Sequence, residues 1–174
     1  SILTALHEQL RLKVVEKKYW ALVAGQWDGK IKKVTEPLKK NTLQSGERIV
    51  RVDERDGKPS ETRFKVLQRF AEGTLLEAFP VTGRTHQIRV HMTYINYPLV
   101  GDPVYAGRPR PPRKADESLL TVLRGFKRQA LHAAMLRLAH PITGELLEWH
   151  APVPDDMVEL TRALREDTAI HGMD

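Results

Sequence analysis

Residues 18–27, KYWALVAGQW, constrain the fold more than any other stretch, because a strand with this sequence is apolar on both faces. Strands of that kind are typically buried between other elements. A second strand is predicted for residues 74–83, TLLEAFPVTG. Residues 47–70 predict two more strands around Asp56-Gly57, a pair typical of a hairpin turn. Residues 131–152 predict a strand, a Pro-Ile-Thr-Gly turn and another strand.

Three segments have helical patterns. Leu3, Leu6 and Leu10 recur at helical spacing in residues 1–11, where Ser1 or Thr4 is suited to cap the helix. Residues 116–126 predict a second helix. Residues 154–167 predict a third, which opens with a proline and two aspartates. Strands joined by hairpins and mixed with helices predict an α+β domain with a mixed, mostly antiparallel sheet and packed helices.

Residues 81–91, VTGRTHQIRVH, concentrate two arginines and two histidines without an acidic residue. Ile88, Met92 and Ile95 follow at helical spacing, which predicts a helix that starts at Thr85 as its N-cap and is stopped by Pro98. Three cationic or polar side chains then surround the free N–H groups of the first turn: Arg84, His86 and Arg89. This cluster favours a phosphate or carboxylate site, although an arginine bonded to a local carboxylate for stability is the alternative.

Other kinds of site are not indicated. His86 and His91 are five residues apart, a poor spacing for one helical face, and no cysteine completes a ligand set, so no metal site is expected. Asp102 lies between a glycine and a proline, which favours a turn residue over a nucleophile.

Charge and composition narrow the partner and the compartment. The chain has 28 Lys and Arg against 22 Asp and Glu, a net charge of +6, which favours a polyanion such as nucleic acid, although solubility alone is the alternative. The absence of cysteine excludes disulfides and thiolate chemistry. No apolar run is long enough for a membrane span, and no signal peptide opens the chain, so we expect a cytoplasmic protein. The chain does not begin with Met, which is consistent with a fragment or a processed product.

Four motifs in order resemble the RluA family of pseudouridine synthases. They are KKYWALVAG (17–25), TGRTHQIRVHM (82–92), PLVGDPVYAG (98–107) and ALHAAMLRLAHPITGELLEWHAP (130–152). Residues 1 to about 80 are most similar to the RluC branch, and residues from about 90 onward to the RluD branch. The family's HRLD motif, which carries its nucleophilic aspartate, does not occur in the chain. The resemblance therefore implies that residues 1–174 are the C-terminal portion of one catalytic domain, with no second domain.

The resemblance also implies roles for individual residues. Arg89 corresponds to the arginine that pairs with the nucleophilic aspartate, and Tyr19 to the active-site tyrosine, although Tyr19 is also suited to a buried strand. Leu131 is expected to pack against the target base. Three residues are expected to contact RNA or support the pocket: Arg84, His86 and Gln87. Four residues form a proline-stiffened loop suited to phosphates or simply to solvent: Arg108, Arg110, Arg113 and Lys114.

The expected function is isomerisation of specific uridines to pseudouridine in large-subunit ribosomal RNA, by a monomer that needs no metal, small-molecule cofactor or membrane. Because the HRLD motif is missing, we expect the chain by itself to be inactive. The alternative function, from a different class, is an RNA-binding module without catalysis.

Overall fold

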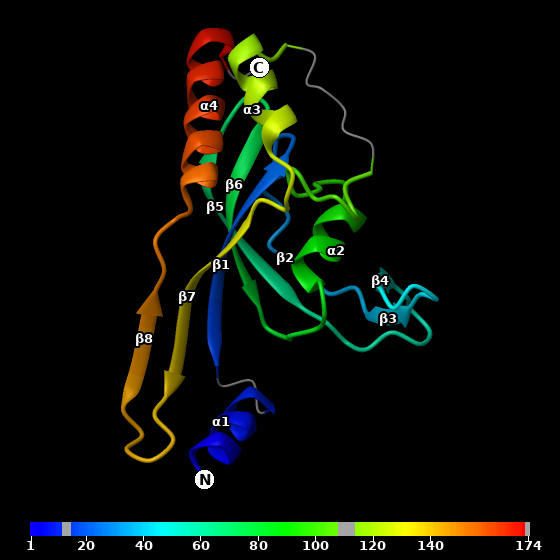
Figure 1. Ribbon diagram of the computed structural model, residues 1–174, viewed down its shortest axis with the longest axis vertical. Coiled ribbons are helices and arrows are strands. Elements are labelled where there is room, and N and C mark those ends of the chain that lie inside the picture. Colours follow the sequence, from blue (N-terminus) through cyan, green and yellow to red (C-terminus); the bar gives the residue numbers. More distant parts are fainter. Residues whose placement is uncertain (12–14, 108–113, 173–174) are drawn as a thin grey trace.

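A computed structural model describes residues 1–11, 15–107 and 114–172. Within them, one six-stranded sheet has the order β2-β5-β6-β1-β7-β8, and every neighbouring pair is antiparallel (Figure 1). Its strands are β1 (Glu16–Ala24), β2 (Lys33–Val34), β5 (Thr62–Arg69), β6 (Gly73–Pro80), β7 (Leu131–Ala139) and β8 (Leu146–His150). The expected α+β class with a mostly antiparallel sheet is confirmed.

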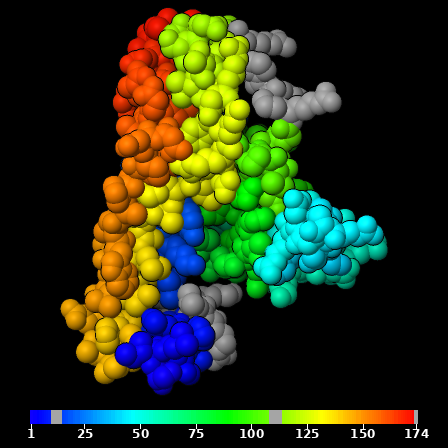
Figure 2. Space-filling model, in the orientation of Figure 1, coloured from blue at the N-terminus to red at the C-terminus, as the bar shows by residue number. Residues whose placement is uncertain are grey.

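Four helices are present in the described residues. They are α1 (Ile2–Arg11), α2 (Gln87–Tyr94), α3 (Glu117–Gly125) and α4 (Asp155–His171). Ser1 caps α1 as expected, since its hydroxyl accepts the backbone N–H of Thr4 at 3.2 Å. Helices α3 and α4 pack side by side at one end of the molecule, while the small sheet of β3 (Leu38–Thr42) and β4 (Arg48–Val52) protrudes on one side (Figure 2).

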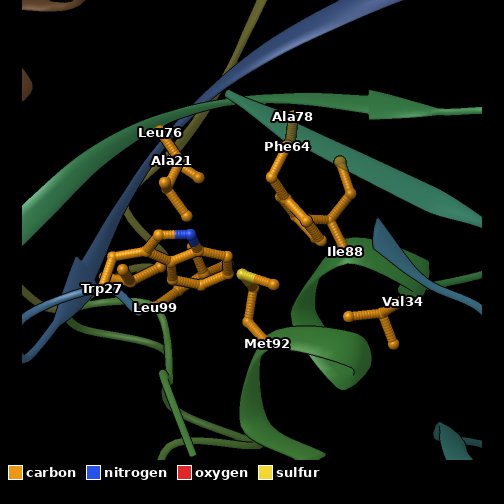
Figure 3. Packing of buried hydrophobic residues seen from close by; sticks show 10 residues of the cluster. Ala21, Trp27, Val34, Phe64, Leu76, Ala78, Ile88, Met92 and Leu99 are labelled. Atoms are coloured by element: carbon orange, nitrogen blue, oxygen red, sulfur yellow. The ribbon is translucent and has the colours of Figure 1, made fainter. Parts of the chain in front are cut away.

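The core forms on both faces of β1, as its sequence predicts. Ala21 and Val23 pack on one side with Trp27, Met92 and other residues of the sheet and α2 (Figure 3). Leu22, which points the opposite way, packs with residues of α3 and α4. All three consecutive side chains of β1 are fully buried. The strand is therefore the centre of a three-layer arrangement, with α2 on one face of the sheet and α3 and α4 on the other.

The hairpin predicted around Asp56 and Gly57 is wrong, although both strands exist. Strand β4 pairs with β3 in a separate two-stranded sheet, and β5 pairs with β2 and β6. The carboxylate of Asp53 accepts the N–H groups of Arg55 and Asp56, and its carbonyl accepts that of Gly57, so the chain turns there without returning along β4. The apolar side chains of the small sheet pack on α2 through Val90, not on β5.

The segment after α2 pairs alongside the C-terminal part of β1, through a bridge between Val23 and Leu99, and fixes the position of Asp102. Val100 donates its N–H to Leu22 of β1 and accepts that of Ala130, just before β7. Gly101 follows with a φ of +76°. A Cβ there would lie 2.3 Å from the carbonyl oxygen of Arg128 and 2.7 Å from the ring of Phe126. Glycine is therefore required at 101 by backbone conformation and by space.

No helix in the described part of the chain is both long and apolar enough to cross a membrane.

Gly101→Ala tests whether glycine is required at position 101. We expect the free energy of unfolding to fall by about 2–5 kcal/mol, because a left-handed alanine costs roughly 1–2 kcal/mol and overpacking adds about 1–3 kcal/mol. Gly46→Ala is the matched control, since Gly46 has a φ of +86° and no neighbouring atom within 4 Å. Urea denaturation of both variants measures the difference. Equal losses would show that the chain relaxes around the added methyl group and that crowding contributes nothing.

Candidate functional site

A cavity of about 700 Å³ lies where the N-terminal half of β1, the loop after β6, the start of α2 and the start of β7 meet. In Figure 2 the surface is hollowed beside β1, between β7 and the segment that carries α2. Six residues singled out in the sequence line the cavity: Tyr19, Arg84, His86, Gln87, Arg89 and Leu131. Three segments far apart in the chain therefore converge on one concave surface.

The loop between β6 and α2 is held by the amide of Gln87, which is only 4% exposed. Its Oε1 accepts the hydroxyl of Thr82 at 2.5 Å and the N–H of Arg84 at 3.1 Å. Its Nε2 donates to the carbonyl of Glu61 at 2.8 Å and to Thr62 Oγ1 at 2.9 Å. The side chain is thus satisfied within the protein, and this arrangement favours the pocket-supporting alternative for Gln87 over direct RNA contact.

The predicted N-cap of the helix is wrong by one residue. Helix α2 begins at Gln87, and its N-cap is His86, with φ 53° and ψ 22°, not Thr85. The hydrogen bonds of the Gln87 side chain draw residues 82–84 onto β5, so the chain enters the helix through a left-handed residue. The helix ends at Tyr94, before Pro98, and Asn96 also adopts a positive φ of 69°.

Arg89 forms a buried two-point ion pair with Asp102. Its Nε donates to Oδ2 at 2.9 Å and its Nη2 to Oδ1 at 2.8 Å, and the two side chains are 10% and 1% exposed. Oδ1 also accepts the backbone N–H groups of Val104 and Tyr105. Asp102 is thus both the turn residue that its sequence context predicts and the partner of Arg89. The sequence contains a signal for this pairing, since Asp102 is the only acidic residue between positions 78 and 115.

The pair shifts the pKa of both partners. Burial alone would raise the pKa of Asp102, but the hydrogen bonds from Arg89, Val104 and Tyr105 outweigh it, and the pKa lies below its ordinary value. The hydrogen bond to Asp102 raises the pKa of Arg89. Burial and the positive charge of Arg89 lower the pKa of His86. The cavity wall therefore contains a charged arginine beside a neutral imidazole at pH 7.

Tyr19 lies in β1 at a shift of register opposite β7, and its Cα pairs with those of Ala78 and Ala133. Burial raises the pKa of its hydroxyl, which is therefore protonated at neutral pH. Tyr19 and Leu131 both pack against the core on the α2 face of the sheet and also line the cavity. The core and site interpretations of Tyr19 are thus compatible.

Of the four residues of the predicted basic loop, the structure describes only Lys114. Arg108, Arg110 and Arg113 lie outside the described residues. Lys114 is exposed, does not line the cavity and acts electrostatically on Glu72, in the β5–β6 turn. The RNA contact expected of this loop stays a prediction.

His91 is buried, and its hydrogen-bond partners differ from that of His86. Its Nδ1 shares a 2.8 Å hydrogen bond with Thr62 Oγ1, and its Nε2 lies 2.8 Å from the carbonyl oxygen of Glu36. No group of three or more histidine, cysteine, aspartate or glutamate side chains in the described residues is arranged to hold a metal ion.

Asp102→Asn should lower the free energy of unfolding by about 3–5 kcal/mol at pH 7, because the charge of Arg89 would lose its buried partner. The folded pKa of Asp102 is depressed, so its contribution is complete above the ordinary value of about 3.9 and disappears as the pH falls through the folded pKa. The difference between wild type and variant should therefore narrow below about pH 4.

The control is Asp156→Asn, which breaks the two-point pair of Asp156 with Arg128, whose side chains are 45% and 40% exposed. This substitution should lower the free energy of unfolding by about 1 kcal/mol or less, because solvent screens the pair. Denaturation curves between pH 3 and 7 measure both variants. Similar losses in the two would contradict a special role for the buried pair.

Comparisons with known proteins agree on one family. The model of the family described as RNA pseudouridylate synthase matches residues 1–94. Ribosomal large subunit pseudouridine synthase D of Pasteurella multocida (strain Pm70) is 60% identical over 118 residues, which cover 68% of this chain and 36% of that protein. Ribosomal large subunit pseudouridine synthase C of Escherichia coli (strain K12) is 50% identical over 165 residues, 95% of this chain and 50% of that protein.

A solved structure of another RNA pseudouridylate synthase protein has a similar fold. The solved structure of Human RNA Pseudouridylate Synthase Domain Containing 4 superposes with a TM-score of 0.71 and 26% identity, over 93% of this chain and 67% of that one. The chain spans half or less of the length of the two bacterial proteins. With the cavity and its residues in place, the matches show that the chain belongs to the RNA pseudouridylate synthase family and that it is similar to both bacterial synthases, types C and D.

Proposed function

We propose that residues 1–174 form the C-terminal portion of a catalytic domain that isomerises uridines in large-subunit ribosomal RNA. The observation that carries the proposal is the cavity in which Tyr19, Arg89 and Leu131 meet from β1, α2 and β7. The names of the bacterial relatives support the RNA substrate. The net charge of +6 favours the same kind of partner.

In the proposed reaction a uridine is flipped into the cavity and its C1′–N1 bond is broken. The uracil turns, C1′ bonds to C5, the C5 proton leaves, and N1 gains a proton. An aspartate of the HRLD motif, supplied from outside these 174 residues, initiates the sequence. Tyr19 offers a ring that stacks on the flipped base. Because its hydroxyl is protonated, it can act at C5 only as a relay, in which the phenolic oxygen accepts the C5 proton while its own proton passes to water. Leu131 packs against the base.

Arg89 is suited to hold that aspartate in one orientation. Asp102 occupies its Nε and Nη2, and no hydrogen bond among the described residues engages Nη1. Because Arg89 also lines the cavity, Nη1 is a donor that a second carboxylate can use. In this arrangement Asp102 fixes the guanidinium, and the incoming aspartate accepts a hydrogen bond from Nη1.

A non-catalytic RNA-binding module is the second candidate. It is favoured by one observation, the absence of an HRLD motif from the chain. The two candidates differ in whether a longer form of the protein, with the motif, converts uridine.

The 174-residue chain alone should bind RNA without forming pseudouridine, because its residues can orient a base but include no nucleophile in the expected motif. The measurement is chemical mapping of pseudouridine in large-subunit RNA after incubation with the purified chain. A form extended through an HRLD segment is the positive control. Turnover by the 174 residues would mean that one of their own carboxylates is the nucleophile, and the role given to Arg89 would be abandoned.

In a complete, active form, Tyr19→Phe keeps the ring and removes only the hydroxyl. Product formation should fall about 10²–10⁴-fold if the hydroxyl transfers the C5 proton, whereas RNA affinity should stay near that of the wild type. Tyr94→Phe is the control, because Tyr94 is 49% exposed at the end of α2 and does not line the cavity. Unchanged turnover in Tyr19→Phe would limit Tyr19 to packing and stacking.

A further inference from the structure

Tyr105 contacts two side chains of the cavity wall without lining the cavity itself. Its hydroxyl lies 2.7 Å from Nδ1 of His86, and its ring lies beneath the guanidinium of Arg89, 4.9 Å from the guanidinium carbon. The same hydroxyl accepts the backbone N–H of Val50 in β4 at 3.0 Å. One phenol thus joins the small sheet to His86 and Arg89 at the start of α2.

The hydrogen bonds at this phenol favour one tautomer of His86. A tyrosine hydroxyl has one proton to donate and two lone pairs. Val50 N–H uses a lone pair, so the phenolic proton has one described acceptor, His86 Nδ1. A neutral imidazole that accepts at Nδ1 carries its proton on Nε2. The reverse tautomer would leave the phenolic proton without a described acceptor.

Three further observations support a fixed imidazole. Burial and Arg89 lower the pKa of His86, so the ring is neutral at pH 7. His86 also has a left-handed backbone, with φ 53°, a conformation that is unfavourable for a non-glycine residue and has to be held by its surroundings. The rings of His86 and Tyr105 meet edge to face at 71°, with centroids 5.6 Å apart.

The other ring nitrogen is available to a ligand. No hydrogen bond among the described residues engages Nε2 of His86, and Nε2 is not among their buried, unpaired polar atoms. Since His86 lines the cavity, an Nε2–H group there is a neutral donor beside the charged Arg89. Its complement is an acceptor oxygen, which uridine provides as a carbonyl and RNA as a phosphate.

We propose that Tyr105 is a positioning residue that fixes His86 as the Nε2–H tautomer, so that the cavity presents a neutral donor to an acceptor oxygen of the bound nucleotide. The nature of the ligand rests on the proposed function, but the tautomer does not. Tyr105→Phe keeps the ring under Arg89 and removes the hydroxyl. His86→Asn keeps a residue that tolerates the left-handed backbone and removes the imidazole.

The first experiment is ¹H–¹⁵N correlation spectroscopy of the histidine rings in the 174-residue chain at pH 7, with His86→Asn to assign the signals. We expect wild-type His86 to be a single tautomer protonated at Nε2, and Tyr105→Phe to give a mixture. A wild type protonated at Nδ1, or the same tautomer ratio in wild type and Tyr105→Phe, would overturn the proposal. Once the signals of His86 are assigned, the wild-type spectrum tests its tautomer even if Tyr105→Phe folds poorly.

The second experiment titrates the same sample with uridine, which has no phosphate, and separately with inorganic phosphate. At least one should shift the Nε2 signal, and the effective ligand distinguishes a base carbonyl from a phosphate. Its affinity should fall about 3–10-fold in Tyr105→Phe, the value of one hydrogen bond. No shift with either probe would overturn the ligand part. The tautomer would still be tested by the histidine spectrum, and the proposed function by pseudouridine mapping with a complete form.

Discussion

The ion pair between Arg89 and Asp102 is the interaction on which the site depends. It joins α2 to the segment that follows it, and the same carboxylate oxygen accepts the backbone N–H groups of Val104 and Tyr105. A buried pair of this kind contributes little net stability over an apolar substitute, yet losing either partner is costly. Its effect here is geometric: one carboxylate sets both the direction of the guanidinium and the place of the tyrosine beneath it.

Strand β1 combines the core and the site in nine residues. Ala21, Leu22 and Val23 are fully buried in the middle of the sheet, whereas Tyr19, two residues earlier, lines the cavity. The side chain of Tyr19 is thus placed by a strand that cannot shift without disturbing both faces of the core. Residues presented from such strands are held more accurately than residues on loops, which suits a ring that has to stack on a base.

Most elements could be predicted because their signals are local. Apolar patterns located the strands and helices, and the family motifs identified Tyr19, Arg89 and Leu131, which the structure gathers around one cavity. Which strands pair, and which side chains contact one another, could not be predicted in this way. The Asp56-Gly57 pair marks a real turn, but packing on α2 decides that β4 joins β3. The helix start depends on where the buried amide of Gln87 finds its partners. The role of Tyr105 depends on contacts 19 and 55 residues away in the chain.

The unequal anchoring of the two cavity walls has a consequence for hydrogen exchange. One wall is formed by β1 and β7, inside the six-stranded sheet. The other includes His86, whose phenolic partner is tied to a two-stranded sheet with a three-residue buried cluster of its own. Amide protons of β1 should exchange only through global unfolding, whereas those of β3 and β4 should exchange through smaller, local openings. We therefore expect the β1–β7 side of the cavity to stay closed until the protein unfolds, and the side next to the small sheet to open locally while the rest stays folded.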